Sequence, residues 1–216
     1  MNVQPQELPR REFYRLLITA VVPRPIAWVS TISRDGVRNL APFSFFNALC
    51  ATPPLLGFCP GIRPQEVREV MGAGVKDTLR NVRETGEFVV NVVTVSLAEA
   101  MNVTAGEYDP SVDEFALAKL TMRPSQRVRP PQVAESPISL ECAVHQILDF
   151  GTETAGGSLV IGEIVSVHLE EAVLRDGRLD AQLLDLVGRM GGSQYCRTRD
   201  RFEMTRPELK VKKEKQ

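Results

Sequence analysis

Short runs of alternating apolar and polar residues, rich in β-branched and aromatic side chains, indicate β structure in the first half of the chain. Asp35-Gly36 lies between two such runs and predicts a tight hairpin turn, because glycine tolerates a positive φ angle. The segment 60–75 contains glycines and prolines and is expected to be a loop. The pattern predicts strands over residues 26–33, 37–46 and 55–59.

Helix signals and longer β patterns follow. A short helix is expected over 12–17, and a longer one begins at Lys76-Asp77-Thr78 and ends at Gly86. Two Ser-x-x-Glu patterns occur, Ser96 with Glu99 and Ser111 with Glu114. Each predicts a capping box at the start of a short helix. Further strands are expected over residues 88–93, 136–150 and 158–171.

The order of these elements predicts a mainly β fold with helices inserted between strands. Strands do not alternate with long helices, so a doubly wound parallel sheet is disfavoured. A closed antiparallel barrel removes exposed sheet edges and is the simplest architecture. A single domain is expected over residues 12–205, with a polar arm at 1–11 and a charged, disordered tail at 206–216.

Composition and charge narrow the classes of function. The 216 residues are 43% hydrophobic and 25% charged, which is ordinary for a soluble globular protein. The net charge of -1 provides no electrostatic attraction to nucleic acid or anionic membranes. The apolar run at 16–22 is too short to span a bilayer, and the N-terminus lacks a secretory signal pattern. We therefore expect a cytoplasmic protein.

The cysteines and histidines are too scattered to predict a metal site. Four cysteines occur without a C-x-x-C pair, and only two histidines, His145 and His168, are present. We expect neither structural zinc nor a disulfide framework. The thiols are expected to be reduced and mostly buried, at Cys50, Cys59, Cys142 and Cys196.

Three segments carry candidate binding chemistry, and the first is 23–31. Ser30 and Thr31 place hydroxyl groups at the end of a predicted strand, where they can donate to the phosphate or sugar-alcohol oxygens of a ligand. Taken alone, a Ser-Thr pair is more often found because it favours turns and strands.

The second segment, 39–47, places hydroxyl and amide groups among aromatic rings. Ser44, Phe45, Phe46 and Asn47 suit a flat heteroaromatic ligand, with apolar surface for the ring and donors for its polar edge. Composition alone favours a buried strand in which Phe43 and Phe45 share one face while Ser44 and Phe46 share the other.

The third segment is the helix start at Lys76, Asp77 and Thr78. Unpaired N–H groups, the helix dipole and the lysine charge would together hold a phosphate monoester. The alternative is an ordinary capped helix with a solvated lysine. The acidic residues Glu107, Asp109, Asp113 and Glu114 lack the spacing of a calcium loop and are interpreted as a solvated face and a helix cap.

Together these segments resemble the flavin reductase-like, FMN-binding split-barrel family. The resemblance covers roughly residues 10–205 and depends on the order of many short matches rather than on one diagnostic motif. It implies a six-stranded antiparallel Greek-key split barrel that forms a homodimer with FMN near the subunit interface. The matches lie at 23–31, 39–47, 53–54, 76–78, 86–91, 112–115, 140–142 and 189–195.

The resemblance also assigns roles to particular residues. Ser30, Thr31, Lys76 and Thr78 would surround the phosphate and ribityl chain, with Asp77 beside them, and the segment 44–47 would line the isoalloxazine. Arg24, Arg189 and Tyr195 are further candidates because they lie in matched segments. The stretch between Cys59 and Lys76 is longer than usual for the family, so Arg63 could share the phosphate role.

The implied activity is that of an NAD(P)H-dependent flavin reductase, which passes a hydride to non-covalently bound FMN and electrons onward to an acceptor or partner enzyme. Hydride transfer needs no general base, so no catalytic side chain is expected, and His145 is assigned no role. An FMN-bound electron carrier of the flavoredoxin type is the alternative. A related barrel that has lost flavin or binds another planar cofactor is the third possibility.

Overall fold

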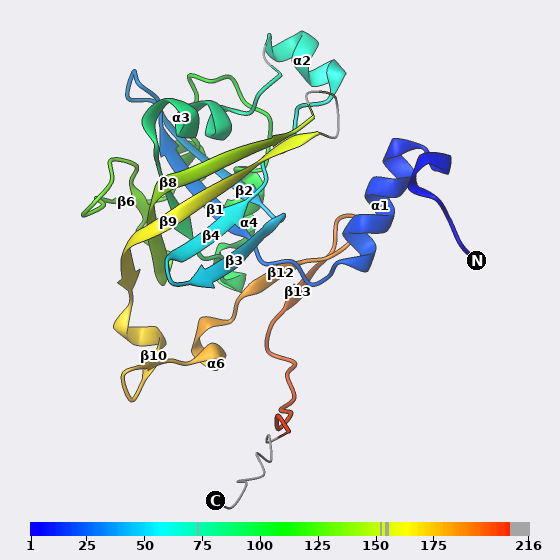
Figure 1. Ribbon diagram of the computed structural model, residues 1–216. Coiled ribbons are helices and arrows are strands. Elements are labelled where there is room, and N and C mark those ends of the chain that lie inside the picture. Colours follow the sequence, from blue (N-terminus) through cyan, green and yellow to red (C-terminus); the bar gives the residue numbers. More distant parts are fainter. Residues whose placement is uncertain (73, 152, 154–155, 208–216) are drawn as a thin grey trace, which may run out of the picture.

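The computed structural model describes residues 1–72, 74–151, 153 and 156–207. At its centre lies a seven-stranded sheet of order β2-β1-β5-β8-β9-β4-β3, in which every neighbouring pair is antiparallel (Figure 1). These strands are β1 (Ala27–Ile32), β2 (Arg38–Phe43), β3 (Phe46–Ala51), β4 (Pro54–Phe58), β5 (Glu87–Asn91), β8 (Ile138–Phe150) and β9 (Gly157–Leu169).

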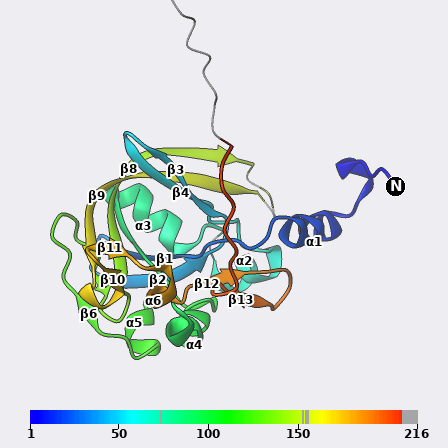
Figure 2. The same cartoon turned by 90° about the horizontal axis from the view of Figure 1, so that it is seen from below.

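The sheet curves around a hydrophobic core, which α3 (Asp77–Thr85) also enters (Figure 2). This inner cluster draws residues from β1, β2, β4, β5, β8 and β9 and from Leu79 and Val82 of α3. The ring of Phe58 lies at its centre, with ring centroids 5.2 Å from those of Phe43 and Phe88. Strands from both ends of the sheet thus bury their apolar sides against one another.

A second core covers the outer side of β1. The side chains of β1 alternate, as the strand period requires: Ala27 and Val29 belong to the inner cluster, while Trp28 belongs to the outer one. The Trp28 ring packs beneath α4 (Ala98–Val103) and α5 (Glu114–Leu117) with Met101 and Phe115, and its indole N–H donates to Thr104 Oγ1 at 2.9 Å.

The remaining elements surround this barrel. The helix α1 (Arg10–Ala20) extends away from the sheet, and the hairpin of β12 (Val187–Arg189) and β13 (Tyr195–Arg197) lies beside its C-terminal end (Figure 1). No described helix is long and apolar enough to cross a bilayer. The others are η1 (Pro5–Glu7), α2 (Gln65–Met71), η2 (Val95–Leu97), β6 (Met122–Arg123), β7 (Gln132–Val133), η3 (Glu171–Val173), β10 (Leu174–Arg175), β11 (Arg178–Leu179) and α6 (Ala181–Leu184).

The mainly β fold is confirmed, and several details are corrected. The strand expected over 37–46 is two strands, because the chain bends at 44–45, so the sheet has seven strands rather than six. The segment 60–75 contains α2 and is not entirely a loop. Only Cys142 is fully buried among the four free cysteines. Most of the tail expected to be disordered, 208–216, lies outside the described residues.

The expected capping serines are also corrected. Asp113 rather than Ser111 caps α5, because its Oδ1 accepts from the N–H groups of Phe115 and Ala116. No side chain caps η2 or α4, so Ser96 does not have the expected role. Both short helices exist, but the Ser-x-x-Glu spacing places their starts incorrectly.

Candidate functional site

Most of the predicted site residues fall into two groups near opposite ends of β2. Asn39 lies near one end and is bonded to α3, while Ser44 follows the other end. Ser44 is five positions after Asn39 along extended chain, a span of about 16 Å. One group consists of Arg24, Ser44, Phe45, Phe46 and Asn47, and the other consists of Thr31, Lys76, Asp77 and Thr78. Ser30 belongs to neither group.

The first group lies where the chain bends between β2 and β3. Phe43 and Phe46 both turn toward the inner core, and Phe45 between them is 42% exposed. The Phe45 ring lies 6.4 Å from that of Tyr14 on α1, and Asn47 is exposed beside it. The interpretation that pairs Phe43 with Phe45 on one face is therefore wrong, because the bend interrupts the strand alternation. An exposed ring with neighbouring hydroxyl and amide groups results.

Arg24 supports this bend from inside the molecule. Its guanidinium donates to the carbonyl oxygens of Ile18 at 2.6 Å, Val21 at 2.8 Å and Met190 at 2.9 Å, and through Nε to Ser44 Oγ at 3.4 Å. Burial lowers the pKa of Arg24 from its ordinary value. The side chain thus joins the end of α1, the residue after β12 and the 44–47 segment.

The hydroxyl groups of Thr31 and Thr78 lie inside a buried polar network. Both donate to Asn39 Oδ1, at 3.3 Å and 2.6 Å, and Thr31 Oγ1 accepts from Asn81 Nδ2 at 3.0 Å. Thr31 is 0% exposed and Thr78 is 1% exposed. Direct contact of either hydroxyl with a ligand stays a prediction, and it requires the covering residues to move. As they lie, the two threonines join β1 to α3.

Ser30 lies on the opposite face of β1. It is fully buried, and its hydroxyl donates to the carbonyl oxygen of Pro131 at 2.5 Å and accepts from Asn91 Nδ2 at 3.4 Å. Because successive side chains of a strand point to opposite faces, Ser30 and Thr31 do not present their hydroxyls together. A phosphate role for Ser30 also stays a prediction.

Glu114 adds a carboxyl group to the buried network. Its two oxygens accept from Asn39 Nδ2 at 2.7 Å and from the Leu40 N–H at 3.1 Å. Burial raises the pKa of Glu114 to about 7 despite these hydrogen bonds, and the nearby Asp77 carboxylate adds to the increase. The expectation that Glu114 belongs to a solvated face is wrong, because the residue is only 7% exposed.

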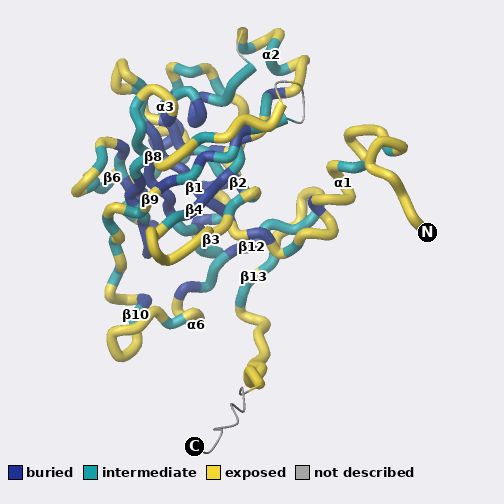
Figure 3. Tube along the Cα trace, in the orientation of Figure 1, coloured by how far each residue is buried: buried dark blue, intermediate teal, exposed yellow. Residues whose placement is uncertain are grey.

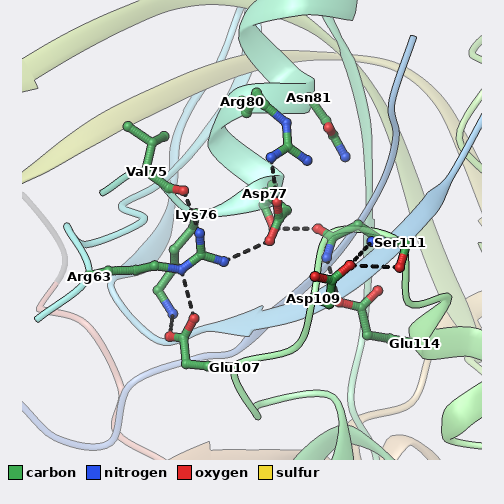
Figure 4. Close-up of polar contacts among 12 residues, drawn as sticks. Arg63, Val75, Lys76, Asp77, Arg80, Asn81, Glu107, Asp109, Ser111 and Glu114 are labelled. Atoms are coloured by element: carbon green, nitrogen blue, oxygen red, sulfur yellow. Dashed lines mark hydrogen bonds and ion pairs between the residues drawn. The ribbon is translucent and has the colours of Figure 1, made fainter. Parts of the chain in front are cut away.

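A cluster of charged side chains surrounds the start of α3 (Figure 4). Lys76 Nζ lies 2.8 Å from Glu107 Oε1, and Arg63 Nε lies 2.9 Å from Glu107 Oε2. Asp77 pairs with Arg63 at 2.7 Å and with Arg80 at 2.6 Å. Three cationic side chains therefore meet two carboxylates at this helix start, which leaves an excess of one positive charge.

The chemistry of this group fits an anion such as a phosphate monoester. No side chain caps the N-terminus of α3, so the N–H groups of its first turn lack a side-chain acceptor, although Asp77, Thr78 and Leu79 are buried. Lys76 is the N-cap residue, and its side chain is 31% exposed, whereas that of Arg63 is 2% exposed. The Arg80 side chain is 34% exposed. Lys76 and Arg80 are therefore the cations that a ligand can contact, whereas the phosphate role considered for Arg63 requires Arg63 to leave its partners.

Sequence reasoning named Arg63, Glu107 and Glu114 but missed the pairings that complete these networks. Arg63 and Glu107 are 44 positions apart, and Asn39 and Glu114 are 75 apart, so no local spacing connects them. The mixed polar and aromatic composition of 39–47 was the only signal that included Asn39. A hollow lined by Arg175, Arg178 and Asp180 contains none of the predicted site residues.

Comparison with known proteins identifies the family. The sequence profile of the flavin reductase like domain matches residues 19–192. An uncharacterised protein of Halalkalibacterium halodurans is 40% identical over 216 residues, which cover 99% of this chain and 100% of that protein. The chain belongs to the flavin reductase like family.

Solved structures give the same answer. Nitrilotriacetate monooxygenase component B from Bacillus cereus superimposes with a TM-score of 0.86 and 33% identity, covering 94% of this chain and 98% of that one. The 2-nitrobenzoate 2-nitroreductase NbaA from Pseudomonas fluorescens superimposes with a TM-score of 0.83 and 31% identity, covering 97% and 98%. The fold is the antiparallel split barrel of this flavin-binding family.

Proposed function

We propose that this chain is an NAD(P)H-dependent flavin reductase that binds FMN non-covalently and passes electrons to an acceptor or partner enzyme. The observation that carries this proposal is the placement of a cationic helix start without a side-chain cap and an exposed aromatic bend near the two ends of one strand, β2, in a member of a flavin-binding family. An elongated ligand with a flat ring and an anionic tail suits that arrangement.

Different residues bind the phosphate and the ring of the flavin. Lys76 and the first-turn N–H groups of α3 hold the phosphate, because both favour an anion. Phe45 borders the ring, with Phe46 behind it against the inner core, while Ser44 and Asn47 hydrogen-bond its polar edge. Arg24 orients Ser44 through its Nε. When bound, the flavin supplies the redox chemistry by accepting a hydride from the reduced nicotinamide.

The names of the similar proteins support onward transfer of electrons. One is a component of a monooxygenase and the other is a nitroreductase. A partner oxygenase or a small reducible molecule is therefore the class of acceptor to test. We also propose a homodimer, because Leu49, Phe150 and Val167 expose large apolar side chains on strands of the main sheet. Figure 3 shows that β3 is among the strands coloured as exposed.

The test is anaerobic reduction of the flavin by NADH and by NADPH, followed by flavin absorbance. We expect FMN to bind the protein and to bleach promptly with at least one nicotinamide, much faster than free FMN in the same buffer. Bound FMN that neither nicotinamide bleaches would overturn the reductase assignment and favour the flavoredoxin-like carrier. Failure to bind FMN at all would contradict both assignments.

A further inference from the structure

We propose that Glu107 competes with the flavin phosphate for Lys76, so that the flavin exchanges as a substrate instead of remaining a tightly held group. This inference rests on the proposed function, because it concerns the same binding site. It concerns Lys76, which with Arg80 is one of the two partly exposed cations of the α3 cluster, and Glu107, the carboxylate that already pairs with Lys76.

Both carboxylate oxygens of Glu107 accept hydrogen bonds from cationic side chains. Oε1 accepts from Lys76 Nζ at 2.8 Å and Oε2 accepts from Arg63 Nε at 2.9 Å. The side chains of Lys76 and Glu107 are 31% and 30% exposed, so an anion from solvent can reach this ion pair and contact Lys76. A phosphate that binds Lys76 must therefore take the place of Glu107 or share the lysine with it.

The opposite side of Glu107 is held firmly. Arg63 also donates to the Val75 carbonyl oxygen at 2.7 Å and to Asp77 Oδ2 at 2.7 Å, so its guanidinium has a fixed place. The loop that carries Glu107 is folded on itself, with the Tyr108 hydroxyl donating to the Val103 carbonyl oxygen at 2.7 Å. A Cβ at Gly106 would lie 2.6 Å from the Tyr108 ring, so the glycine permits this packing.

Glu107 also keeps its charge over the range in which flavin binding is measured. Burial opposes ionisation, but the hydrogen bonds from Lys76 and Arg63 outweigh it and lower the pKa of Glu107 below its ordinary value. The carboxylate therefore competes throughout the neutral and mildly acidic range. A competing anion fixed within the protein weakens each phosphate contact and speeds the release of the ligand.

The experiment compares FMN with riboflavin, which has the same ring and ribityl chain but lacks the phosphate. Dissociation constants are measured by fluorescence titration for the full chain and for Glu107→Gln, Lys76→Ala and the double variant. We expect Glu107→Gln to tighten FMN about fivefold and to slow its dissociation, because a partly exposed ion pair is worth at most about that factor. Riboflavin affinity should not change.

The other variants show whether the effect passes through Lys76. Lys76→Ala should weaken FMN about fivefold without affecting riboflavin, and Glu107→Gln should have little further effect in that background. Glu99→Gln, which removes an exposed carboxylate from α4, is the matched control and should change neither ligand. Glu107→Asp keeps a charge for Arg63 but shortens the side chain, and it should also tighten FMN if Glu107→Gln does not fold.

The outcomes separate this inference from the function on which it rests. If neither flavin binds the unmodified chain, or if Lys76→Ala leaves the ratio of FMN to riboflavin affinity unchanged, the proposed site itself is wrong. If FMN binds through Lys76 but both folded Glu107 variants leave its affinity unchanged or weaken it, the competition is refuted while the proposed function stands.

Discussion

Glu114 is a carboxylic acid whose protonation the fold places within the physiological range. Its pKa is raised to about 7, whereas the ordinary value is 4.5. The folded chain therefore holds a proton between about pH 4.5 and pH 7 that the unfolded chain has released. Raising the pH through this window favours the unfolded state and removes stability. Above pH 7 the loss is complete.

We therefore expect the unmodified chain to lose stability relative to Glu114→Gln as the pH rises from 5 to 8. The relative change in unfolding free energy should be on the order of 2 kcal/mol, because each pKa unit corresponds to about 1.4 kcal/mol. Urea unfolding at several pH values measures it. Glu66→Gln on the exposed side of α2 is the control. Parallel curves for Glu114→Gln and the unmodified chain would show that Glu114 does not titrate in this window.

The acidic character of the stretch from Glu107 to Glu114 is evident from the sequence, but the environment of each residue in it was not predictable. Asp109 is exposed, Asp113 caps a helix, Glu107 pairs with two cations and Glu114 is buried, although all four belong to one acidic stretch. Sequence spacing predicts local roles such as a cap. It does not predict burial against Asn39 or pairing with Arg63, because those partners are distant in the chain.

At the scale of elements, α3 shows what local signals can determine. The helix begins at Asp77 and ends before Gly86, as the sequence predicts, because the glycine adopts a left-handed conformation with φ of 72°. The bend at 44–45 was missed, since Arg24 bonds to it from 20 positions away. The seven-residue α2 was also missed, although its contact is local: Arg68 donates to the Arg63 carbonyl oxygen only five positions away.

Gly86→Ala should destabilise the protein by about 1 kcal/mol. A Cβ at this position would meet no atom within 4 Å, so the expected cost is the backbone strain of a left-handed alanine alone. Gly61→Ala is the matched control, because its backbone is not left-handed and its Cβ would have its nearest contact at 3.9 Å. Thermal unfolding should show a lower Tm for the first variant and little change for the second. Equal Tm values would contradict the assigned capping role.

At the scale of the whole molecule, the curved sheet brings distant segments to one strand. The split-barrel fold could be predicted, because it depends on the order of many short matches along the chain. The division of the site into two groups could not, because it depends on where β2 begins and ends relative to α3 and on the bend that begins β3. A ligand that spans β2 would connect the two groups.

The outer surface of the sheet leads to the expectation of a dimer. Leu49 of β3 and Leu159 of β9 both lie over Gly57, where a Cβ would approach their Cδ1 atoms to 3.1 Å and 3.0 Å. Leu49 is 47% exposed, so the sheet presents apolar surface at this point. Burying such surface against a second copy stabilises an assembly by roughly 25 cal/mol per Å² of apolar area.

Light scattering after size exclusion should therefore give about twice the chain mass of 24.0 kDa. Leu49→Glu should shift the mass toward that of a single chain, because a carboxylate at the contact would lose its hydration. Val70→Glu, at an apolar position of α2 that is 84% exposed, is the matched control and should leave the dimer intact. A monomeric unmodified chain that still binds flavin would show that one copy of the barrel suffices for the site.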